Sequence, residues 1–338
     1  MGVSVSRDQA ADVWRALAIV GVVFIHVADH TFSGSIKPLL TGCFRWAVPV
    51  FLMLTAYFVA LSVQRSPEVR LWPFLTQRYA KLWPPFVAYS ALYALLTVDW
   101  QHLTAITLLT KHFSGYGWAG QYFFILLFQL LPVAYWLARR PLSARGVVGI
   151  TVLTLGVYSL VWHCLRDHAV WTKIGERPII YWLPYAAWGV YLAQTRPGWM
   201  PWLQQRLHPA AGVMALLILP WLASWGAQPA GSLSAYLAPS VLLTSMLMLP
   251  LGLVLFQGLH APLISYAGRH SMVIFCLNPL WTFVWQRLGL FSRLPDDGHV
   301  DVLLWRTLAS VIAVAATMFM CLLTGEVFKR VGLKALVM

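Results

Sequence analysis

The chain has 338 residues, of which 59% are hydrophobic and only 10% are charged, and its formal net charge is +13. A soluble globular domain has about 25% charged residues, so this chain has too few charges to cover a surface that faces water. Its basic residues occur in short groups between apolar stretches, as they do in the loops of membrane proteins. The composition therefore predicts an integral membrane protein and argues against a soluble domain and against a nucleic-acid partner.

Apolar stretches of about 20 residues, the length that crosses a hydrocarbon core, recur along the whole chain. We expect an all-α fold of about ten transmembrane helices that forms a single domain over residues 1–338. The expected spans are residues 11–28, 43–63, 82–98, 119–138, 145–163, 179–194, 208–226, 235–256, 263–286 and 303–325. Segment 102–113 is apolar but too short to cross, which favours an interfacial or re-entrant position. Prolines, among them Pro84, Pro85 and Pro197, are expected to mark the joints between spans.

The distribution of charge predicts the orientation of the chain. With the N-terminus on the cytoplasmic side, the loops on that side collect more lysines and arginines than the opposite loops, among them Arg65, Arg78 and Lys81. Most of the acidic residues, including Asp296 and Asp297, fall on the opposite side. Because basic loops stay in the cytoplasm, we expect both termini to be cytoplasmic, which requires an even number of spans.

The cysteines and histidines do not predict a metal site or a disulfide framework. Cys43, Cys164, Cys276 and Cys321 lie in or beside apolar segments and form no CxxC pair, so we interpret them as small core residues. Neither an HExxH pattern nor a cysteine cluster with the spacing of a zinc site is present in the sequence. We therefore expect no bound metal.

Two ionisable residues lie in the first expected span, Arg15 near its start and His26 near its end. Such groups are costly inside a membrane and are therefore candidates for function. Eleven positions on an α-helix are close to three turns and about 16 Å, so both side chains lie on roughly the same face. A guanidinium commonly binds phosphate and an imidazole is the usual general base near neutral pH. The alternatives are that Arg15 flanks the span or pairs with Asp12, and that His26 is a structural histidine.

Five segments, taken together and in this order, resemble the membrane-bound acyltransferase-3 family. They are WRALAIVGVVFIHV (14–27), AVPVFLMLTAYFV (47–59), FLTQRYAKLWPPF (74–86), WAGQYFFILLFQLLP (118–132) and SYAGRHSMVIFCLNPL (265–280). Three departures from the family pattern stand out. Thr55 and Ala56 replace a Ser-Gly pair, Lys81 takes the second place of an Arg-x-x-Arg motif, and Asn278 stands where the family usually has histidine.

The resemblance implies a multi-pass protein of the cell inner membrane that transfers an acyl group to a hydroxyl of a carbohydrate. The acyl group in this family is most often acetyl, with acetyl-CoA as the donor. A cytoplasmic opening that carries Arg15, Arg78 and Lys81 suits the phosphates of CoA. His26 is then expected to act as the catalytic base, and Arg15, three turns away on the same helix, is the second catalytic candidate.

Four residues are candidates for the acceptor side. Arg45 is expected near the depth of His26, where it polarises a carbonyl, binds the acceptor or extends to the membrane surface. Trp118 and Tyr122 either stack against sugar rings or take part in packing and interfacial belts. Asn278 either contacts substrate or makes structural hydrogen bonds. Sequence alone leaves these alternatives open.

Arg269 and Glu326 fall near the cytoplasmic ends of their spans and are expected to pair.

A carrier or flippase for a glycan or a lipid-linked glycan is the main alternative function, although the sequence shows no internal repeat of the kind many transporters have. A non-catalytic scaffold or receptor has no use for an Arg–His face inside the membrane. Membrane lipids and a carbohydrate or lipid-linked glycan are the expected partners.

Overall fold

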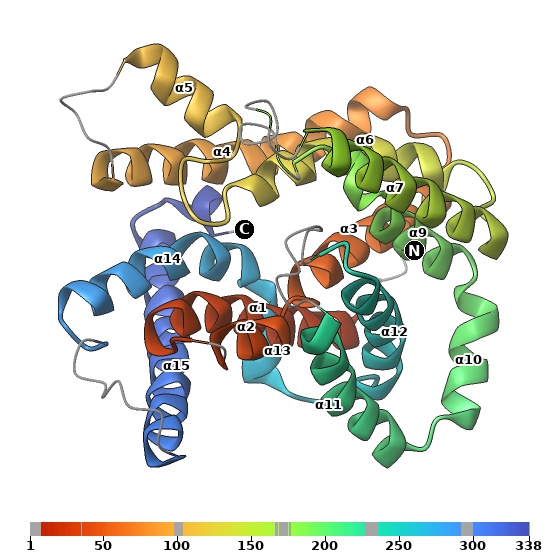
Figure 1. The fold of residues 1–338 in the computed structure, drawn as a ribbon. Helices are drawn as coiled ribbons and strands as arrows, with labels where there is room; N and C mark the ends of the chain where they lie inside the picture. Colours follow the sequence, from red (N-terminus) through yellow and green to blue (C-terminus); the bar gives the residue numbers. More distant parts are fainter. Residues whose placement is uncertain are drawn as a thin grey trace.

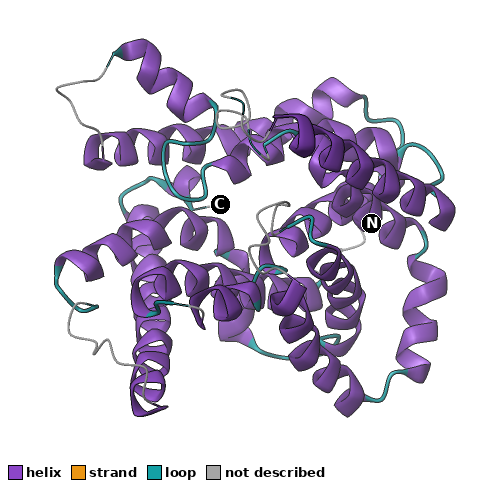
Figure 2. Cartoon of the chain, viewed as in Figure 1, coloured by secondary structure: helices purple, strands orange, loops and turns teal. Residues whose placement is uncertain are grey.

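The computed structural model describes residues 8–34, 36–97, 104–165, 168, 175, 177–226, 236–291 and 300–337. Every element in these ranges is helical, which confirms the predicted all-α class (Figure 2). The α-helices are α1 (Gln9–Thr31), α2 (Ile36–Gly42), α3 (Ala47–Arg65), α4 (Leu71–Thr97), α5 (Ala105–Phe113), α6 (Tyr122–Ala138), α7 (Ala144–Leu165), α9 (Leu183–Gln194), α10 (Arg196–Arg206), α11 (Pro209–Gly226), α12 (Pro239–Leu255), α13 (Pro262–Arg269), α14 (Ser271–Arg287) and α15 (Val300–Arg330). Two short 3-10 helices, η1 (Ile179–Trp182) and η2 (Lys334–Leu336), complete the described elements.

Several of these helices are suited to a membrane. Within the described residues, four helical stretches are long and apolar enough to cross one: α1, the stretch Ile36–Arg65 that comprises α2 and α3, α7, and Leu303–Arg330 of α15. Helices α10 and α11 form a pair bent by 106° that would count as a fifth span, and α6 and α12 are shorter apolar helices. Since the chain also has few charges, it is a membrane protein.

Helix α1 lies at the centre of the molecule. It packs against α2, α3, α12, α13, α14 and α15, and Figure 1 shows it between α15 and α12. In the most apolar window of α1, 72% of the residues are buried, against 17% for α7 and 28% for α15. The outer helices therefore turn apolar side chains outward, as lipid-facing helices do. The functional candidates on α1 are enclosed by other helices.

Glycines allow the central helices to approach one another closely. A methyl group added at Gly189 of α9 would lie 2.3 Å from the carbonyl oxygen of Met53 on α3. A methyl group at Gly268 of α13 would lie 1.9 Å from the carbonyl oxygen of Asp12 on α1. Because lipid provides little hydrophobic force between helices, such small residues set how tightly the backbones pack.

The structure corrects several predicted element boundaries. Pro84 and Pro85 lie inside α4, which begins at Leu71 and not at residue 82. Membrane helices tolerate internal proline because neighbouring groups satisfy the freed carbonyls. The expected span 263–286 is divided at His270 into α13 and α14. Residues 196–206, expected to be a loop, form α10, with proline in the first turn, where no amide donor is required.

Helix α5 is a short helix with a capping box at Thr104, while the first two residues of the predicted segment 102–113 lie outside the described residues. Asp296 and Asp297 also lie outside them.

All four cysteines are free. Cys43, Cys276 and Cys321 are buried, but Cys164 is exposed near the end of α7, so its interpretation as a core residue was wrong.

Candidate functional site

The first turns of α1 place two acidic residues and Arg15 together. Asp8 caps the helix by accepting a hydrogen bond of 3.2 Å from the backbone amide of Ala11. Arg15 Nη1 lies 3.1 Å from Oδ1 of Asp12, one turn earlier, so the ion pair considered from the sequence is present. The Arg15 guanidinium also lies over the ring of Phe58 on α3, 4.8 Å from its centroid. Arg15 therefore joins the start of α1 to α3.

A cavity of about 440 Å³ opens beside this pair. It is lined by Asp8, Asp12, Arg15, Phe58, Leu61, Ser62, Arg65, Ser66 and Arg78. Arg78 is held by a hydrogen bond of 3.4 Å to Ser62 and lies over the ring of Phe74, 5.0 Å from its centroid. The structure thus brings Arg15 and Arg78 together, as the predicted donor site requires. Lys81 is exposed and is not among the residues that line this cavity.

Arg65 belongs to the cavity although sequence reasoning assigned it only to a basic loop. Helical spacing could have predicted it: Arg65 follows Phe58 by seven residues, which is close to two turns of α3, so the two side chains lie on the same face. The acidic residues of the cavity are also paired: Asp8 Oδ2 lies 3.6 Å from Nη2 of Arg196 on α10. Arginines and serine hydroxyls that converge on one opening suit the binding of a phosphorylated ligand.

The other end of α1 carries His26, which is partly buried. Arg45, Asp29 and His30 all lie within electrostatic range of its imidazole. Since His26 follows Arg15 by eleven positions on the helix, the two lie about 16 Å apart along the axis of α1. One helix therefore presents a cationic cavity at its start and a titratable group close to its end.

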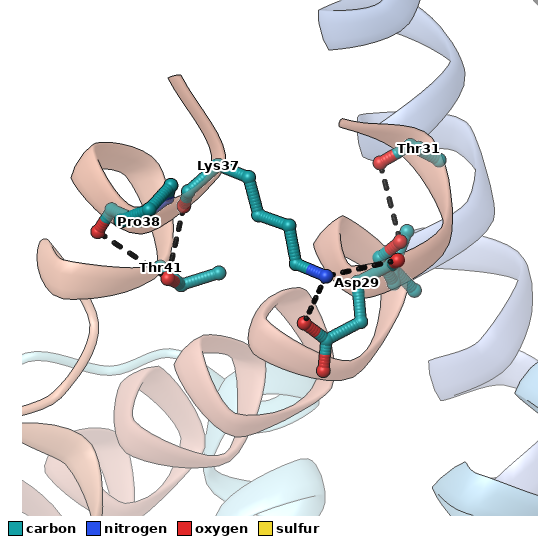
Figure 3. A network of polar contacts seen from close by, with 6 residues as sticks. Asp29, Thr31, Lys37, Pro38 and Thr41 are labelled. Carbon is teal, nitrogen blue, oxygen red and sulfur yellow. Dashed lines mark hydrogen bonds and ion pairs between the residues drawn. The ribbon is translucent and has the colours of Figure 1, made fainter. Parts of the chain in front are cut away.

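Polar contacts fix the turn that follows His26 (Figure 3). Lys37 Nζ lies 3.1 Å from Oδ1 of Asp29 and donates a hydrogen bond of 3.3 Å to the carbonyl oxygen of Asp29. Thr41 donates to the carbonyl oxygens of Lys37 and Pro38, at 2.9 and 3.3 Å. The connection from α1 to α2 is thereby tied together, and the Asp29 carboxylate that acts on His26 is held in place.

Arg45 meets Tyr236, a residue that sequence reasoning missed. Arg45 Nη1 donates to the Tyr236 hydroxyl at 3.4 Å, and the guanidinium lies 5.4 Å from the ring centroid. Tyr122 donates to the same hydroxyl at 3.4 Å, and Tyr185 donates to the carbonyl oxygen of Tyr236. Arg45 and Tyr122, two of the residues predicted for the side of the acyl acceptor, are therefore linked through the hydroxyl of Tyr236. Nothing in the sequence around Tyr236 indicates this role.

Trp118 and Asn278 lie in a neighbouring buried region. Trp118 is stacked on Tyr93, with ring centroids 5.0 Å apart, and the ring of Phe275 meets it edge-on, with centroids 6.2 Å apart. Asn278 is fully buried, and its amide donates to the carbonyl oxygens of Ile274 and Phe275 at 3.0 and 2.8 Å. Its Oδ1 is buried and has no hydrogen-bond partner among the described residues. One face of Trp118 is thus covered by protein, whereas Asn278 keeps an acceptor for another group.

Gln121 fixes the segment that carries Trp118 and Tyr122, and it was also missed from the sequence. Its Oε1 accepts from the backbone amide of Gly117 at 2.6 Å, and its Nε2 donates to Ser90 at 2.6 Å. Nε2 lies 3.0 Å from Nδ1 of His112, which therefore accepts. Burial, and secondarily the charge of Lys111, lower the pKa of His112, which is consistent with a neutral, accepting imidazole.

No group of three histidines, cysteines or carboxylates that could bind a metal ion occurs in the described part of the chain. Residues 8–325 match the family model described as an acyltransferase domain, and this range contains the cavity at the start of α1 and all the residues around His26. No curated protein and no solved structure matches the chain.

Proposed function

The chain belongs to the acyltransferase-3 family, and from this premise we propose that it is an integral membrane O-acyltransferase. It moves an acetyl or another short acyl group from cytoplasmic acyl-CoA to a hydroxyl of a cell-envelope or exported carbohydrate. The observation that supports this most strongly is the layout of α1, with an arginine-lined cavity at its start and His26 near its end. A donor that is phosphorylated at one end and reactive at the other fits this layout.

On the donor side, the cavity provides Arg15, Arg65 and Arg78 for the phosphates of CoA. Arginine forms bidentate, charge-assisted hydrogen bonds with phosphate oxygens, which favours it for this task. Lys81 lies outside the cavity lining, three residues after Arg78 on α4, and is proposed as a further contact for the nucleotide. The long pantetheine arm then spans the distance of about 16 Å to His26.

On the acceptor side, His26 removes the proton from the attacking hydroxyl. The acceptor oxygen bonds to the thioester carbonyl carbon, the carbon–sulfur bond breaks, and the CoA thiolate leaves and takes up a proton. Arg45 stabilises the negative charge that develops on the carbonyl oxygen, as positioned cations do in acyl transfer. Tyr122, Trp118 and Asn278 are proposed to contact the acceptor, and Arg15 contributes to catalysis by holding the donor in place.

The proposal includes a single domain in the cell inner membrane, with about ten spans and both termini in the cytoplasm. The long apolar helices support membrane insertion. The remaining spans would come from the shorter apolar helices α6 and α12 and from elements that are divided or bent, such as α13 with α14. This arrangement exposes the cavity to cytoplasmic acyl-CoA.

The test uses the purified full chain in lipid nanodiscs with acetyl-CoA and a glycan extract of the cell envelope. Release of free CoA that depends on both additions, together with acetylated glycan in the mass spectrum, is the expected result. Envelope glycans from cells with and without the gene provide the matching comparison. Glycan transport without CoA release would contradict an acyltransferase and favour a carrier.

A further inference from the structure

A second polar cluster, outside the donor cavity, joins α13 and the turn after it to α15. Lys329 Nζ lies 2.6 Å from Oε1 of Glu326 and 2.6 Å from Nε2 of His270. Tyr266 donates a hydrogen bond to Glu326, and the rings of Tyr266 and His270 lie 4.2 Å apart. We call Tyr266, His270, Glu326 and Lys329 the polar latch. The expected pairing of Glu326 with Arg269 was wrong, because Tyr266 and Lys329 take the carboxylate.

The geometry defines the state of the latch histidine. His270 Nδ1 lies 2.8 Å from the carbonyl oxygen of Tyr266, so this nitrogen carries a proton and donates. A lysine ammonium can only donate, so Nε2 of His270 accepts from Lys329. The imidazole is therefore neutral and uses both of its nitrogens. Because these bonds connect residues 266 and 270 to residues 326 and 329, they fasten α13 to the end of α15.

The latch acts on the start of α1 through Gly268. This glycine lies between Tyr266 and His270, and a methyl group on it would come within 1.9 Å of the carbonyl oxygen of Asp12. No side chain separates the two backbones at this point. Any shift of α13 is therefore transmitted to the first turns of α1, where Asp12 is paired with Arg15 at 3.1 Å. Both residues line the donor cavity.

We propose that the four latch residues are positioning residues for acyl-donor binding, because they set where Asp12 and Arg15 stand in the cavity. The proposal rests on the proposed function. Opening the latch frees α13, relaxes its contact with Asp12 and moves the Arg15 guanidinium away from the donor phosphates. His26 lies about 16 Å further along α1, so the chemical step keeps its geometry. The latch therefore affects the KM for acyl-CoA and leaves kcat unchanged.

Steady-state kinetics with the full chain in nanodiscs test this directly. Lys329→Met and Glu326→Gln each remove a charge-assisted hydrogen bond, and each is expected to raise the KM for acetyl-CoA roughly tenfold. Tyr266→Phe keeps the ring and is expected to have a smaller effect in the same direction. Arg330→Gln is the matched control, since this neighbouring cation is exposed and outside the latch. A latch that serves only stability would lower the melting temperature and leave KM unchanged.

Binding of CoA itself, measured by calorimetry, separates this inference from the proposed function. Lys329→Met should weaken CoA binding strongly in the wild-type background and much less in an Arg15→Lys background, because residues that act through one another are not additive. Wild-type protein that binds CoA but transfers no acetyl group when given acetyl-CoA and glycan would overturn the proposed function alone. Folded Glu326→Gln and Tyr266→Phe variants with wild-type CoA affinity would overturn the latch alone. Failure of the wild type to bind CoA would overturn both.

Discussion

His26 is the residue on which the proposed chemistry depends most. It shares its surroundings with a cation, Arg45, and an anion, Asp29, and Asp29 is held by Lys37. In the proposed mechanism the Asp29 carboxylate stabilises the positive charge that His26 acquires when it takes a proton, whereas the nearby Arg45 cation favours the neutral imidazole that accepts the proton.

We expect His26→Gln to abolish acyl transfer while leaving the fold and CoA binding nearly intact. Glutamine has about the same size and forms hydrogen bonds, but it does not accept a proton at neutral pH, and loss of a general base costs about 10²- to 10⁴-fold in rate. CoA release measures the rate, and calorimetry with CoA controls for the donor site. Substantial transfer by a well-folded His26→Gln protein would contradict this mechanism.

Arg15 is expected to contribute mainly to donor affinity. Arg15→Ala should weaken acyl-CoA binding strongly, since it removes a cation from the cavity and leaves Asp12 facing the donor phosphates. Arg15→Lys should restore part of the affinity, because the charge returns but the bidentate geometry does not. Titration with CoA gives the affinities of both variants. Unchanged affinity in Arg15→Ala would exclude this residue from the donor site.

The sequence predicted the candidate residues that lie in local motifs. Arg15 and His26 are on one helix, so their spacing suggests them, and Arg78 belongs to the basic segment that resembles the family motif. Tyr236 escaped prediction because its partner Arg45 is 191 residues away in the chain. Gln121 and Glu326 are comparable cases: a sequence shows that a polar residue lies in an apolar segment but does not show which distant group will bind it.

At the scale of the helices, tight packing of α9 on α3 holds the wall of the site. Gly189→Ala is expected to destabilise the protein by about 1–3 kcal/mol, since its methyl group would collide with the Met53 carbonyl and push two helices apart. Gly149→Ala on α7 is the control, because no atom lies within 4 Å of the added methyl group. Thermal unfolding in nanodiscs gives the melting temperatures of both variants. Equal melting temperatures would show that α3 and α9 can separate without cost.

Helix boundaries were predicted less well than helix existence. Proline is a reliable end signal in water, but Pro84 and Pro85 continue α4, because other groups in a membrane protein satisfy the carbonyls that proline frees. The break at His270 has no proline inside it and was missed for that reason. Tyr266, before this break, and His270, at it, bond to Glu326 and Lys329 of α15, and only the tertiary structure shows these contacts.

The whole molecule has a predicted orientation that labelling can test. With the exposed Cys164 replaced by serine and the three buried cysteines kept, a cysteine introduced at Lys37 and one introduced at Ser66 should react from opposite sides of the membrane. Residue 66 should react from the cytoplasm, because its loop belongs to the basic set. The two positions lie on either side of α3, so labelling of both from one side would contradict the orientation and the donor route with it.

The membrane class of the whole molecule follows from composition alone, whereas the arrangement of its helices does not. In water, the apolar face of a helix indicates what it packs against. In lipid, both sides of a helix are apolar, and only close contacts such as Gly268 with Asp12 decide its neighbours. The central place of α1 was therefore visible only in the structure.

The Asp12 carboxylate of the donor cavity has a consequence for turnover. Asp12 pairs with Arg15 of the cavity at 3.1 Å, so under the proposed function the phosphates of the donor would compete with this carboxylate for the arginine. The same competition would weaken binding of the spent CoA, because it carries the same phosphates. Since product release limits many enzymes, Asp12 would then lower the affinity for the donor and speed the departure of CoA.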